Sequence, residues 1–156
     1  MIRGLGNVGC TVALLSGVFL QSTSPAHAVP CSALLGTIAQ ADDGFQDWSP
    51  PVSGWPGAAP EACTRSLSQG GLVAMNCRWK FGYRVAAADV AHGALLEAVR
   101  HCVPNAHVVL EEAPVNHPDS YLATTFDAGT VTVAVTLKDK AALGASFVFL
   151  RVEAQR

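Results

Sequence analysis

The stretch between Cys63 and Cys77 constrains the fold most, because its pattern predicts a β-hairpin that carries a disulfide. Gly70 lies midway between the two cysteines, and a short connection such as Gln69-Gly70-Gly71 is typical of a hairpin turn. Residues 63 and 77 would then lie opposite each other with their Cα atoms about 4.5–5.5 Å apart, within reach of a disulfide. The spacing therefore predicts the pair Cys63–Cys77.

The periodicity of apolar residues changes along the rest of the chain. Alternation from Leu72 to Tyr83 indicates a half-buried strand, whereas apolar intervals of three and four between Ala88 and Cys102 indicate an amphipathic helix. A shorter helix is expected from Cys31 to about Asp42. Further strands are expected at 107–112, 121–126, 130–138 and 145–153. This order predicts an α+β fold, an antiparallel sheet of about five to six strands with two helices packed on one face.

The N-terminal residues are typical of a secretory signal. Arg3 precedes an apolar run from Val8 to Leu20, and Ala26-His27-Ala28 places small residues where a signal peptidase cleaves. We expect a signal peptide at 1–28 and a single secreted or periplasmic domain at 29–156, with its mature start at Val29. The sequence GLGNVG at 4–9 has the glycine spacing of a dinucleotide-binding loop, but neither a preceding strand nor a suitably placed acidic residue accompanies it. We therefore expect no nucleotide cofactor.

Four cysteines follow the predicted signal, and an even number in an exported chain favours two disulfides. With Cys63 paired to Cys77, the second bridge would join Cys31 to Cys102 and tie two helix ends together. No cysteine or histidine spacing is typical of a zinc site. His101, His107 and Glu111 could meet around a metal ion, but a solvated histidine at a helix end is the favoured interpretation. We expect neither a metal nor another cofactor.

The net charge of −2 and the absence of a basic cluster argue against a nucleic-acid partner. Beyond residue 28 no apolar run is long enough to span a membrane, so no transmembrane segment is expected in the mature chain. A weak catalytic alternative uses His117, Asp119 and Ser120, which are residue types of a hydrolytic triad. Because these residues surround Pro118 in one short stretch, a turn is the favoured interpretation.

The proline-rich segment at 44–62 carries Trp48 and Trp55 and is long for a connection within a domain. These tryptophans either cap the core or anchor a partner. Arg78 and Lys80, in a basic row with Arg84, lie either on a solvated outer face or on the polar rim of such a docking site.

The stretch NCRWKFGYR at 76–84 has the character of a structural signature, but it identifies no family. The sequence favours an exported, disulfide-bonded protein that is not an enzyme and that binds or modulates an unknown protein partner. The alternative is a small secreted or periplasmic hydrolase. The partner and the oligomeric state do not follow from the sequence.

Overall fold

The computed structural model of the protein describes residues 30–68, 70–114 and 117–155. The predicted signal peptide at 1–28 and the mature start at Val29 lie outside these residues. The elements in chain order are α1 (Ser32–Ala39), β1 (Ala62–Leu67), β2 (Val73–Gly82), α2 (Ala86–Cys102), β3 (His107–Glu112), β4 (Tyr121–Asp127), β5 (Val131–Lys140), the 3₁₀ turn η1 (Ala141–Leu143) and β6 (Ala145–Ala154).

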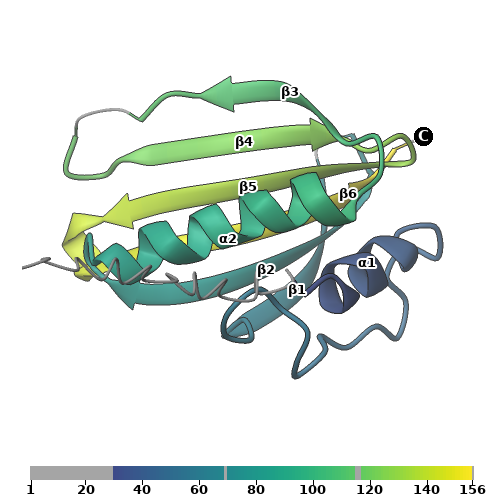
Figure 1. Cartoon of the computed structure of the whole chain (residues 1–156), viewed down its shortest axis with the longest axis horizontal. Coiled ribbons are helices and arrows are strands. Elements are labelled where there is room, and N and C mark those ends of the chain that lie inside the picture. Colours follow the sequence, from purple (N-terminus) through teal and green to yellow (C-terminus); the bar gives the residue numbers. More distant parts are fainter. Residues whose placement is uncertain (1–29, 69, 115–116, 156) are drawn as a thin grey trace, which may run out of the picture.

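The strands form one six-stranded antiparallel sheet in the order β1-β2-β6-β5-β4-β3 (Figure 1). The predicted α+β class is therefore confirmed. The last strand, β6, lies inside the sheet between β2 and β5, and its apolar residues Val148, Leu150 and Val152 are buried. Strands buried by their neighbours are apolar along most of their length, and the sequence SFVFLRV of β6 fits this central position.

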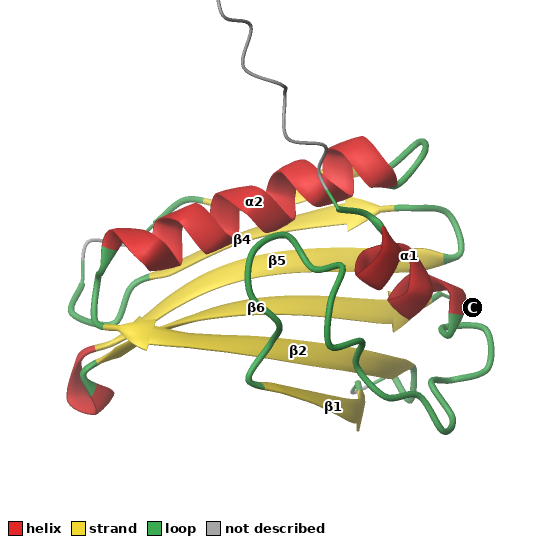
Figure 2. Ribbon diagram, turned by 60° about the horizontal axis from the view of Figure 1, so that its bottom comes forward, coloured by secondary structure: helices red, strands yellow, loops and turns green. Residues whose placement is uncertain are grey.

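The helix α2 packs along β5, β6 and β2 (Figure 2). Its inward residues Leu95 and Val99 belong to the same core cluster as Val133 of β5 and Leu150 of β6. Leu34 of α1 is part of this cluster as well. The helix buries residues that are three and four positions apart, and each strand buries every second residue. Packed together, the two sets form a continuous apolar layer.

Both predicted disulfides are present. Cys63 and Cys77 are direct register partners of β1 and β2 with a Cα–Cα distance of 4.0 Å, as the hairpin pattern predicted. Cys31 at the start of α1 bonds Cys102 at the end of α2, with a Cα–Cα distance of 5.5 Å. Two disulfides fit an oxidising extracellular or periplasmic compartment. No helix in the described part of the chain is long and apolar enough to cross a membrane.

The predicted strand bounds agree with the structure to within two residues, whereas the first helix and the basic row differ more. The first helix ends at Ala39 rather than near Asp42, because the chain leaves helical geometry in a series of turns in which Gly44 and Phe45 have positive φ values of 63° and 55°. β2 ends at Gly82, so Arg84 lies in the turn before α2 and not in one row with Arg78 and Lys80. The predicted basic row was wrong at this position.

Candidate functional site

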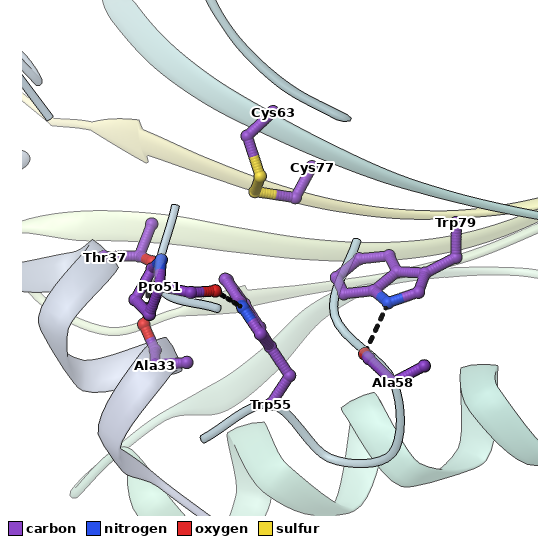
Figure 3. Close-up of a disulfide and its surroundings, with 8 residues drawn as sticks. All are labelled: Ala33, Thr37, Pro51, Trp55, Ala58, Cys63, Cys77 and Trp79. Carbon is purple, nitrogen blue, oxygen red and sulfur yellow. Dashed lines mark hydrogen bonds between the residues drawn. A yellow bond between two sulfur atoms is a disulfide. The ribbon is translucent and has the colours of Figure 1, made fainter. Parts of the chain in front are cut away.

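The proline-rich segment is held against the core by Trp55. This residue is 3% exposed, and its indole Nε1 donates a 2.8 Å hydrogen bond to the carbonyl oxygen of Pro51 (Figure 3). Its ring meets that of Trp79 on β2 edge to face, with the ring centroids 5.5 Å apart. Trp79 in turn donates from Nε1 to the carbonyl oxygen of Ala58 at 2.9 Å. The two tryptophans therefore fasten the segment at two points.

Gly54 brings the same segment close to α1. Its φ is +84°, and a Cβ atom at this position would lie 2.2 Å from Oγ of Ser32. The Gly54 carbonyl oxygen also accepts a hydrogen bond from the backbone N–H of Ala33 at 3.3 Å. Only glycine combines this backbone conformation with such a close approach.

An apolar groove lies between this segment, β2 and α2. Its volume is about 380 Å³, and we call it the α2 groove. The segment, the strand and the helix contribute its lining residues Pro56, Gly57, Ala58, Trp79, Phe81, Ala87, Val90, Ala91, Ala94 and Leu95.

The groove owes its width to small side chains on α2. Ala87, Ala91 and Ala94 occupy its helical wall, where larger side chains would close the space. Val90 at its edge is 71% exposed. The described residues that line the groove include no ionisable side chain, so this site can hold an apolar group by contact but offers no acid, base or metal ligand.

The predicted binding residues lie in different surroundings. Trp55 is buried, whereas Trp48 is partly buried against the core. Lys80 is exposed, and Arg78 pairs with Glu61 at 3.1 Å on the sheet face opposite to Trp79. The guanidinium of Arg78 also lies 5.7 Å from the ring centre of Phe147. The arrangement does not bring all four predicted residues to one surface.

The candidate triad residues likewise do not converge. Ser120 donates from Oγ to Asp139 at 2.6 Å, and Asp119 accepts from Nζ of Lys140 at 2.7 Å. The His117 ring accepts a 3.2 Å hydrogen bond from the backbone N–H of Asp119 at its Nδ1 atom. The hydrogen bond from Lys140, together with that from the backbone N–H of Ala141, lowers the pKa of Asp119. The side chains of Asp119 and Ser120 are thus bonded to residues of β5, and the three candidate residues do not form a catalytic arrangement.

Asp139 is the centre of a polar cluster that no sequence pattern predicted. It is 6% exposed and accepts hydrogen bonds from Ser120, from Ser146 at 2.5 Å and from Nε of Arg84 at 2.9 Å. Burial raises its pKa, but the hydrogen bonds from Ser120, Ser146 and Arg84 outweigh that effect and hold the pKa below its ordinary value. The carboxylate is thus ionised at neutral pH and joins the β3–β4 connection to the ends of β5 and β6.

This cluster borders a second cavity of about 330 Å³ at the start of α2. Arg84, Ser120 and Asp139 line it, and their polar atoms bond one another. The only signal in the sequence was that Asp139 lies between Lys138 and Lys140 at the end of an apolar strand. Nothing local distinguished this aspartate from a solvated one.

Within the described ranges, no three histidine, cysteine, aspartate or glutamate side chains lie close enough to hold a metal ion. His101, His107 and Glu111, the metal alternative considered from the sequence, therefore do not assemble a site. His101 and His107 are exposed at the end of α2 and the start of β3.

No protein-family model matches the chain, and no curated protein is similar to it.

Proposed function

We propose that the protein is an exported, non-catalytic binding protein that holds an aliphatic chain in the α2 groove. In this proposal the signal at 1–28 is removed and the domain that starts at Val29 acts outside the cytoplasm. The observation that carries the proposal is the predominantly apolar lining of the groove, in which Pro56–Ala58 form one wall and the α2 residues Ala87, Val90, Ala91, Ala94 and Leu95 form the other. Removal of apolar surface from water has a favourable free energy, so an apolar ligand that covers this lining should bind.

The size of the groove supports a ligand larger than one small ring. Its volume of about 380 Å³ falls in the range of ligand sites in proteins, which starts at about 300 Å³. An apolar cavity of about 150 Å³ already holds benzene. Because the lining offers no charged partner, the affinity should depend on the length of the hydrocarbon and little on its polar end.

The test uses a chain-length series. Linear alcohols of increasing length displace the neutral fluorescent probe N-phenyl-1-naphthylamine from the protein, and the inhibition constant is measured for each. A buried methylene contributes about 0.8 kcal/mol, so each added carbon should tighten binding roughly fourfold until the groove is full. Affinities that do not change with chain length would contradict the proposal.

A matched pair of variants locates the binding site. Ala94→Phe places a large side chain into the helical wall of the groove and should abolish binding of the probe. Ala86→Phe adds the same atoms to the same helix at an exposed position outside the groove lining and should leave binding unchanged. Equal behaviour of the two variants, with both folded, would place the ligand elsewhere.

A further inference from the structure

The edge strand β3 exposes an unusual amount of apolar surface. Its residues Val108, Val109 and Leu110 are 45%, 53% and 52% exposed. In the described part of the chain β3 pairs with β4 alone, so one side of its backbone has no strand partner. Such an edge is a template for pairing with another strand. The opposite edge, β1, differs because it carries Arg65 and the disulfide of Cys63.

A bulge in β3 determines which of its side chains share a face. The register places His107 opposite Asp127 and Glu112 opposite Ala123, with a shift between Val108 and Leu110. Asp127 and Ala123 are four residues apart on β4 and therefore point to the same face of the sheet. His107 and Glu112 consequently share that face, although they are five residues apart in sequence.

This arrangement makes the edge complementary to itself. We propose that β3 pairs antiparallel with β3 of a second copy of the chain, with the two-fold axis between Val109 and Leu110. His107 then faces Glu112 of the partner subunit, and Val108 faces Glu111 of the partner subunit. Without the bulge the two members of each pair would point to opposite faces. The bulge therefore places His107 on the same face as Glu112 of the partner subunit, where the imidazole and the carboxylate can form a hydrogen bond.

The polar side chains can reach this contact. Nδ1 of His107 lies 3.4 Å from the carbonyl oxygen of Asn105, so its Nε2 is the ring nitrogen that would face Glu112 of the partner subunit. Asp127, the intramolecular register partner of His107, already accepts hydrogen bonds at Oδ1 from the backbone N–H of Gly129 at 2.8 Å and from Gln155 at 3.2 Å. Glu112 is exposed at the end of the strand. The aliphatic residues at the centre would cover one another, as cross-strand pairs do within a sheet.

A contact of six residues from each copy is narrow, and interfaces at the small end of the range are weak and reversible. We therefore expect a monomer–dimer equilibrium at high micromolar concentrations rather than a permanent dimer. The contact lies on β3, whereas the α2 groove adjoins β2, so this inference does not depend on the proposed function.

The experiment is sedimentation equilibrium of the oxidised protein from 10 µM to 1 mM, concentrations that span the range expected for such contacts. The weight-average mass should rise toward that of a dimer. Val109→Lys brings two like charges to the axis and should weaken association at least tenfold, whereas Leu67→Lys, at an exposed position of β1, should not change it. A mass that stays monomeric throughout, or equal weakening by both variants, would overturn the inference.

A charge exchange tests the register. Glu112→Lys removes the carboxylate opposite His107, and His107→Glu places a second anion opposite Glu112, so each should weaken association. The double variant creates an opposite-charge pair in the homodimer and should recover association. Failure of the double variant to recover association, with both single variants weakened, would refute this register. Circular dichroism of each variant verifies that the sheet is intact.

Discussion

Replacement of Trp55 by alanine should destabilise the protein more than any other change in the proline-rich segment. Trp55 is 3% exposed, and truncation of a buried aromatic side chain costs about 3–5 kcal/mol. That range includes the edge-to-face contact with Trp79, worth roughly 0.5–1.5 kcal/mol, and the hydrogen bond to Pro51, worth about 1 kcal/mol. For a domain of this size we expect the melting temperature to fall by roughly 10–25 °C.

Two further variants separate the causes. Trp55→Phe keeps most of the apolar contact but loses the indole hydrogen bond, so about 1–2 kcal/mol should be lost. Trp48→Ala removes a side chain that is only partly buried, and we expect a loss of roughly 1–2 kcal/mol.

Urea unfolding of the oxidised protein at 25 °C gives the free energy of unfolding for each variant. If the free energy of unfolding of Trp55→Ala lay within 1 kcal/mol of that of the unmodified protein, Trp55 would not hold the segment in place. The position of the groove wall at Pro56–Ala58 would then need another explanation.

Three other changes have defined outcomes. Asp139→Asn weakens the hydrogen bonds from Ser120, Ser146 and Arg84 and should cost roughly 2–3 kcal/mol at pH 7. Because the folded-state pKa of Asp139 lies below 3.8, the unmodified protein loses the stability that its carboxylate contributes as the pH falls below 3.8 and through the folded-state pKa, and the difference between the two proteins should shrink over the same range. Urea unfolding at pH 7 and below pH 3.8 measures this difference. Burial lowers the pKa of His92 from 6.5, so below that pH the unfolded chain binds more protons than the folded chain. The free energy of unfolding should therefore fall by up to about 1.4 kcal/mol per pH unit as the pH decreases from 6.5 toward the folded-state pKa. This slope should be smaller in His92→Leu, and an unchanged slope would refute the assignment. The Cys31–Cys102 disulfide closes a loop with a separation of 71 residues, and replacement of both cysteines by serine should cost about 4 kcal/mol. The Cys63–Cys77 disulfide closes a loop with a separation of only 14 residues, and its replacement should cost about 3 kcal/mol. A lower melting temperature for the second variant than for the first would contradict this loop-entropy argument.

Local patterns in the sequence were sufficient for the elements and for the disulfides. Alternation over Val73–Gly82, the helical period over Ala86–Cys102 and the glycine turn between two cysteines each depend on neighbours within a few residues. Because an antiparallel hairpin has a fixed register once its turn is known, the pair Cys63–Cys77 followed from position alone. The second disulfide then followed from the remaining cysteines.

The candidate site depended on tertiary structure. Trp48 and Trp55 have the same residue type in the same proline-rich segment, but only the path of the chain over β2 buries Trp55 against Trp79. Asp139 acquires its partners from residues 84, 120 and 146, which are far apart in sequence. The alanines of α2 border a groove only because the segment at 56–58 passes nearby. Period and turn chemistry are short-range properties of the chain, whereas burial, ion pairing and empty volume arise between segments whose approach no local pattern specifies.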